Sequence, residues 1–168
     1  MPVSGTTRVN TRSVRDRRTI RYADAAALRA DLDALVAAER AGRLTPLGNW
    51  TLGQACGHIA SWMSYPYDGY PMKRPPWLIR LIVMFSKRRY LAGDLPAGVR
   101  IPGLPDGTLA TERHETAEGV RRLTAALARL EREAPRASNP LFGPLTHAQW
   151  KTMNLGHAAL HLSFFKPS

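Results

Sequence analysis

The segment 145–161 constrains the fold most, because it opens with a strong helix-start signal and runs on without a proline. Thr146 and Gln149 have the spacing of a capping box, in which each side chain binds the backbone amide of the other residue. Leu145 and Trp150 fall at the positions of a hydrophobic staple, which fixes how the chain enters a helix. A helix is therefore predicted from residue 146 nearly to the C-terminus.

Three other segments have the pattern of long helices. A second capping box, Thr51 with Gln54, opens a helix predicted to reach residue 64 or beyond. Asp24 is a plausible N-cap for a helix over 24–40, and apolar residues recur there every three or four positions. The same periodicity predicts a helix over 111–133. Four long helices without a strong strand pattern indicate an all-α fold, a helix bundle.

Length and composition favour one domain in a reducing compartment. The chain has 168 residues, of which 44% are hydrophobic, enough for one compact core. No apolar run approaches the ~20 residues of a membrane span, and no secretory signal is visible at the N-terminus. Cys56 is the only cysteine, so an internal disulfide is excluded and a cytoplasmic location is expected. We divide the chain into a basic extended arm, 1–20, and a single domain, 21–168.

The net charge of +11 invites a nucleic-acid hypothesis. Its distribution weakens that hypothesis, because six arginines lie within residues 1–21, where Asp16 is the only acid. A second basic cluster occupies 87–89. No helix-turn-helix, KH or RNP motif accompanies these clusters, so nucleic acid is not an expected partner.

Two histidines in the last predicted helix are the strongest sign of a functional site. His157 and His161 are four residues apart and therefore lie on one helix face, which Asn154 shares. His58 stands in the second helix, four residues after Gln54. Three imidazoles with an open fourth position are the ligand set of a catalytic metal. Spacing alone leaves metal binding and hydrogen-bonded core histidines equally open.

The ligand type suggests the metal and its surroundings. Neutral imidazoles favour zinc or nickel as the divalent metal, with iron or manganese as further candidates. Gln54 and Asn154 are candidates to bind a ligand or a coordinated water, and simple packing is an equal alternative. His114 and His147 are expected to be exposed, and Cys56 is expected to pack in the core.

Two motifs resemble those of the DinB-like superfamily. The run WTLGQ at 50–54, followed by His58, resembles the opening of its second helix. The turn at 139–144, the capping box of Thr146 and Gln149, and the pair His157 and His161 resemble its last helix. With residues 19–22, the chain looks most like one bacterial branch known only as a domain of unknown function. The resemblance covers nearly the whole chain and is weakest over 70–106.

This resemblance implies an antiparallel four-helix bundle with His58, His157 and His161 as its metal triad. Several relatives bind divalent metal, and some are transferases or isomerases that use the thiols mycothiol or bacillithiol. The chain is then expected to be a metal-dependent hydrolase or thiol transferase, whose nucleophile is metal-bound water or a low-molecular-weight thiol. The alternative is a non-catalytic binding or stress-related bundle module without metal. The small-molecule substrate is not identified.

The irregular connection 69–106 contains a short apolar run, 77–85, which Pro76 opens as an extra helix. One interpretation is a lid or a helix that packs on the bundle or forms a homodimer contact. The other is that its apolar face and the basic residues 87–89 touch a membrane surface. Packing or dimerisation is the favoured interpretation.

Overall fold

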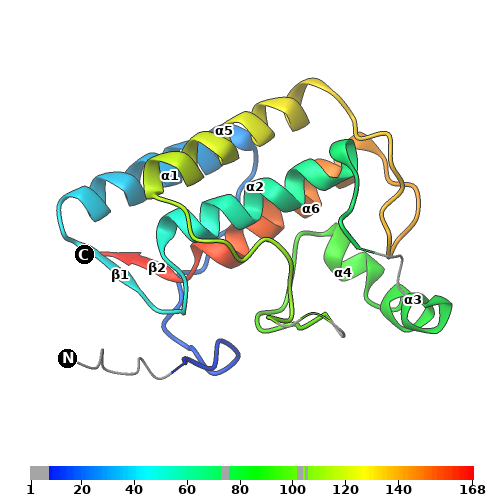
Figure 1. Cartoon of the computed structure of the whole chain (residues 1–168), viewed down its shortest axis with the longest axis horizontal. Coiled ribbons are helices and arrows are strands. Elements are labelled where there is room, and N and C mark those ends of the chain that lie inside the picture. The colour runs from blue at the N-terminus through cyan, green and yellow to red at the C-terminus, as the bar shows by residue number, and fades with distance from the viewer. Residues whose placement is uncertain (1–7, 73–75, 102–103, 105) are drawn as a thin grey trace.

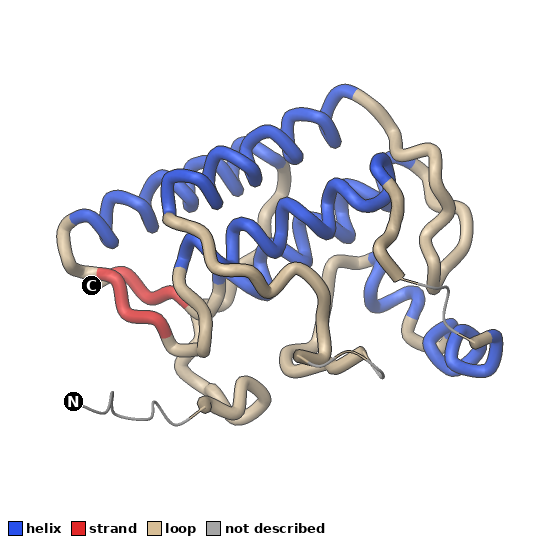
Figure 2. The backbone as a smooth tube through the Cα atoms, viewed as in Figure 1, coloured by secondary structure: helices blue, strands red, loops and turns tan. Residues whose placement is uncertain are grey.

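A computed structural model describes residues 8–72, 76–101, 104 and 106–168. Within these residues, six helices and one two-stranded sheet make a mostly helical fold (Figures 1 and 2). The expectation of a mainly helical chain is confirmed. The sheet is a correction to the all-α prediction, because its two strands are too short to leave an alternating pattern in the sequence.

Helix α1, Ala25–Arg40, forms where the sequence predicts it. The side chain of Asp24 accepts a hydrogen bond from the backbone amide of Ala27, which confirms the N-cap. The apolar residues of one face, among them Leu28 and Leu35, are buried. Gly42 follows the helix with a φ of 67°, a left-handed conformation that glycine adopts without strain.

The two helices that carry the histidines are α2, Leu52–Asp68, and α6, His147–Leu162. The capping box at the start of α6 is complete, with Thr146 and Gln149 each binding the other's backbone amide. At α2 only half of the predicted box forms. Thr51 accepts from the amide of Gln54, but the Gln54 side chain donates to the carbonyl of Thr111 instead.

Helix α5, Thr116–Arg132, begins later than the predicted residue 111. Residues 111–115 run as a loop along α2, where Thr111 accepts the hydrogen bond from Gln54. Helices α2 and α5 then approach each other very closely. A Cβ atom at Gly119 would stand 2.2 Å from the carbonyl oxygen of Gly53, so both positions depend on the missing side chain.

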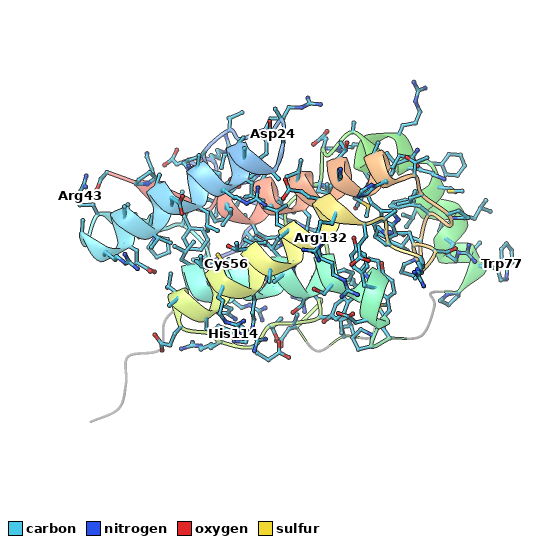
Figure 3. All side chains as sticks on the ribbon, turned by 90° about the horizontal axis from the view of Figure 1, so that it is seen from above. Asp24, Arg43, Cys56, Trp77, His114 and Arg132 are labelled. Carbon is cyan, nitrogen blue, oxygen red and sulfur yellow. The ribbon has the colours of Figure 1, made fainter. Side chains whose placement is uncertain are left out.

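The sheet joins the end of the chain to the loop after α1. Strand β1, Leu44–Pro46, pairs antiparallel with β2, Phe165–Pro167 (Figure 1). Together with the core, this pairing holds the C-terminus beside α1 and so fixes the end of α6. The core lies between α1, α2, α5 and α6 (Figure 3), and it includes Leu28, Leu35, Ile59, Leu123, Leu130 and Leu162. Cys56 is fully buried there, as predicted.

The connection between α2 and α5 contains two short helices, α3, Trp77–Met84, and α4, Lys87–Leu91. The sequence predicted the first and treated residues 87–89 only as a basic end. Helix α4 packs against α6, whereas α3 lies at one end of the molecule and exposes most of its large apolar side chains (Figure 1). The large apolar side chains of α3 are therefore not packed on the bundle, whereas the lid and homodimer interpretations stay predictions. Among the described residues, none of the helices is long and apolar enough to cross a membrane.

The described part of the predicted arm lies against the helical body. Asn49 binds both the amide and the carbonyl of Val9 through its side chain, at 2.8 and 2.9 Å. Arg18 makes a two-pronged ion pair with Asp31 of α1, which also accepts the hydroxyl of Tyr22. Residues 1–7 of the arm fall outside the described part of the chain, and the boundary at residue 20 stays a prediction.

Candidate metal centre

The three predicted histidines meet in space. His58 comes from α2, and His157 and His161 come from α6. One ring nitrogen from each lies within 4.8 Å of the other two. The rings of His58 and His161 have centroids 4.5 Å apart, and those of His157 and His161 are 4.6 Å apart. The Thr51 and Thr146 caps determine where both helices start, and the packing of α2 against α6 brings the histidines together.

The orientation of His58 is fixed by backbone carbonyls. Its Nδ1 atom lies 2.9 Å from the carbonyl oxygen of Leu109 and 3.3 Å from that of Ala110. Carbonyl oxygens only accept hydrogen bonds, so Nδ1 carries the proton and the lone pair is on Nε2. A histidine that donates from one nitrogen to a carbonyl while the other is free is the usual state of a metal ligand.

The loop that supplies these carbonyls is strained at one position. Ala110 has a φ of 55° and is the only non-glycine residue of the described chain with positive φ. Such a conformation is uncommon for alanine, costs of order 1 kcal/mol or more, and clusters at functional sites. It bends the chain so that successive carbonyls, of Leu109 and Ala110, both face His58.

The two histidines of α6 approach each other directly. The Nε2 atoms of His157 and His161 are 3.0 Å apart, with the rings nearly perpendicular. Metal–nitrogen bonds of about 2.0–2.1 Å place two ligands of one ion roughly 3 Å apart, so this spacing suits a shared ion. It equally suits a hydrogen bond, in which one nitrogen donates to the lone pair of the other.

All three imidazoles are held in the neutral form. Burial lowers the pKa of His58 to about 4, although its hydrogen bonds to the two carbonyls act in the opposite direction. Burial also lowers the pKa of His157 and His161 well below the usual value, and the neighbouring His58 adds to the effect. Neutral imidazole is the form that binds a metal, so protons do not compete for these ligands near pH 7.

Aromatic rings surround the triad. The indole of Trp50 stacks on the ring of His161, with centroids 5.2 Å apart and planes 14° apart. The rings of Trp62 and His157 meet edge to face, with centroids 6.1 Å apart. The buried Nε1 of Trp62 has no hydrogen-bond partner among the described residues. These rings belong to the wall of a cavity of about 740 Å³, which also takes in the triad. The cavity has the size of a small-molecule site.

The remaining predicted residues contact groups outside the triad. The Asn154 side chain donates to the carbonyl of Trp150, and that of Gln54 binds Thr111, so both have backbone partners. His147 was expected in solvent, yet its Nε2 lies 2.6 Å from the carbonyl of Leu130. His114 is half-buried and its ring lies over Gly57 of α2, away from the triad.

Sequence reasoning missed the carbonyls of Leu109 and Ala110 and the stacked Trp50. The carbonyls left no signal, because every residue carries one and only the fold decides where it points. Trp50 did leave a signal, since it comes directly before the Thr51 cap of the helix that carries His58.

A family model described as a protein of unknown function, DUF1569, matches residues 14–168, and the chain belongs to this family. The match begins within the predicted arm and includes all three histidines. No curated protein and no solved structure matches the chain.

Proposed function

We propose that this chain is a cytoplasmic four-helix-bundle protein of the DinB-like kind, and that it binds one divalent metal ion through His58, His157 and His161. The observation that carries the proposal is the convergence of three neutral ring nitrogens from two helices. The bundle would consist of α1, α2, α5 and α6, whose apolar faces share one core. Zinc or nickel fits the three-nitrogen donor set best, and iron or manganese fits less well.

Three features of the site support metal binding over a chance cluster. His58 has its proton fixed on Nδ1 by two carbonyls, which leaves Nε2 free. The ligands come from helices, whose positions are more rigid than those of loops. His58 is buried and His157 and His161 are half-buried, so their ring nitrogens need partners, and an ion would satisfy one nitrogen of each ring at once.

The cavity beside the triad supports an enzymatic role, as a metal-dependent hydrolase or a thiol transferase. When bound, a divalent ion supplies Lewis acidity and lowers the pKa of a coordinated water or thiol. The chain itself supplies the surroundings: Trp50 and Trp62 exclude water from one side of the triad. The buried Nε1 of Trp62 is a hydrogen-bond donor without a partner among the described residues.

The alternative is a bundle module that works without metal and without catalysis. The direct contact between His157 and His161 favours it, because a hydrogen bond between their Nε2 atoms satisfies two of the buried groups. In that case the triad stabilises the fold, and the cavity binds a ligand or nothing.

Metal analysis separates the two functions. Untagged protein, purified and then dialysed against zinc, nickel, manganese or iron, should retain close to one ion per chain. The single variants His58→Ala and His161→Ala should lose it. His114→Ala is the matched control, because that histidine is also half-buried beside α2 but lies outside the triad. A wild-type protein that retains no ion, or variants that keep it, would refute the metal site.

A further inference from the structure

Helix α3 has its apolar face turned toward solvent. At about 100° per residue, its exposed apolar side chains occupy an arc of about 160° around the helix axis. The exposed fractions of the two largest, Trp77 and Phe85, which follows directly after the helix, are 73% and 87%. The other members of this apolar face are Leu78, Leu81, Ile82 and Met84. Arg80 and Val83, on the opposite side of the helix, are half-buried.

The fold holds this face away from the rest of the protein. Helix α4 packs on α6 and so anchors the segment, while α3 projects at the end of the molecule (Figure 1). Viewed from above, Trp77 lies at the outer edge of the structure, far from Asp24, Arg43 and Cys56 (Figure 3). Six large apolar side chains exposed side by side are typical of an interaction surface.

Basic residues lie beside the apolar face. The segment 76–94 contains one acid, Asp94, and four basic residues, of which Arg80 lies on the opposite side of α3. The other three, Lys87, Arg88 and Arg89, follow the apolar face in α4. Arg89 pairs with Asp94, and Lys87 binds the carbonyl of Phe142. Arg88 is exposed and takes part in no ion pair among the described residues. The surface therefore combines exposed aromatic rings with a net positive charge.

We propose that the α3–α4 surface, residues 77–91, binds the face of an anionic lipid bilayer. Trp and Phe insert at the boundary between headgroups and acyl chains, and the adjacent cations bind lipid phosphates, as in other interfacial amphipathic helices. A second copy of this chain is a poorer occupant. Each copy carries a net charge of +11, and a two-fold contact through this surface would bring the same cations together.

Vesicle co-sedimentation tests this surface with the full chain. Wild-type protein should pellet with vesicles of phosphatidylglycerol and phosphatidylcholine at low salt, and should bind vesicles of phosphatidylcholine alone far more weakly. The double variant Trp77→Ser/Phe85→Ser should bind the anionic vesicles about tenfold or more weakly, because it loses the two largest inserting side chains. Both residues are exposed in the free protein, so circular dichroism should show an unchanged fold.

Matched variants separate specific docking from general attraction. Arg88→Gln/Arg89→Gln should weaken binding more than Arg121→Gln/Arg122→Gln, which removes the same charge from exposed positions of α5. Equal effects of the two pairs would show a general effect of charge and would refute the surface. So would wild-type protein that does not bind anionic vesicles.

A dimer would give a different result. If analytical ultracentrifugation shows a wild-type dimer that Trp77→Ser/Phe85→Ser converts to a monomer, a second copy covers the surface and the proposal is wrong. A second measurement does not depend on loss of binding. Lipids with brominated acyl chains should quench the fluorescence of bound wild-type protein more than that of Trp77→Phe, which keeps the apolar face but lacks the reporter.

Discussion

Lowering the pH should destabilise the metal-free protein, and His58 should be a main cause. Its pKa is about 4 in the folded state, against a usual value of 6.5. The unfolded chain therefore takes up a proton at this residue as the pH falls through 6.5, whereas the folded chain stays neutral until about pH 4. Stability contributed by the neutral form is fully present above pH 6.5 and is lost between pH 6.5 and 4.

The magnitude follows from the two pKa values. Each pKa unit is worth about 1.4 kcal/mol, and at pH 5 nearly all unfolded molecules but few folded ones are protonated at His58. The free energy of unfolding should then fall by about 2 kcal/mol between pH 7 and pH 5 from this residue alone. His157 and His161 act in the same direction, because burial lowers their pKa as well. Asp31 acts in a more acidic range. Burial alone would raise the pKa of its carboxyl, but the hydrogen bonds from Arg18 and Tyr22 outweigh burial and lower the pKa from the usual 3.8.

Urea unfolding in the presence of EDTA, at pH 7 and pH 5, measures this loss. His58→Gln is the informative variant, because glutamine does not titrate and its side-chain amide can still donate to the Leu109 carbonyl. The loss on acidification should be about 2 kcal/mol smaller in the variant than in the wild type. Equal losses in both proteins would mean that His58 does not stay neutral in the folded state, and the reasoning would fail.

Two further predictions concern the packing that holds the site in place, and urea unfolding at pH 7 measures both. Gly119→Ala should destabilise by about 2 kcal/mol or more, although helix propensity alone favours alanine by about 1 kcal/mol, because the new Cβ meets the Gly53 backbone. In Gly57→Ala the new Cβ meets only the ring of His114, which can move, so the free energy of unfolding should stay within about 1 kcal/mol of wild type. A larger loss of stability in Gly57→Ala than in Gly119→Ala would contradict this packing argument. Asp31→Ala should cost about 2 kcal/mol, because it removes the ion pair of half-buried Arg18 and leaves the hydroxyl of buried Tyr22 without this partner. Exposed Asp33→Ala should cost less than about 0.5 kcal/mol, and equal costs at the two positions would refute the role of the ion pair.

The sequence was sufficient to predict the parts of the site that depend on helix register. Thr51 and Thr146 each accept a hydrogen bond from the amide three residues later, so both histidine-bearing helices start where the capping signals place them. Once a start is fixed, the 3.6-residue repeat determines which side chains share a face. The position of His161 one turn after His157 followed from this repeat. The meeting with His58 required the packing of α2 against α6, which the sequence suggested through the expected bundle and through the resemblance.

The parts that could not be predicted depend on backbone groups and on loops. The carbonyls that orient His58 belong to Leu109 and Ala110, whose side chains have no role in the contact. Gln54 illustrates the same difficulty, because its amide had two possible partners. It could reach back to its own helix start or across to Thr111, and only the path of the 106–115 loop decided in favour of the second.

Helix α3 shows most clearly what apolar residues in a sequence leave open. The sequence predicted both α1 and α3, the first from the spacing of its apolar residues and the second from its apolar run after Pro76. In α1 the apolar face is buried, with Leu28 and Leu35 fully covered, whereas in α3 the face that includes Trp77 is exposed. A periodic pattern shows that a helix has an apolar face but not what covers it, because the covering partner lies outside the segment. The uncovered face of α3 therefore points to a partner outside the chain, and the cations beside it favour an anionic one.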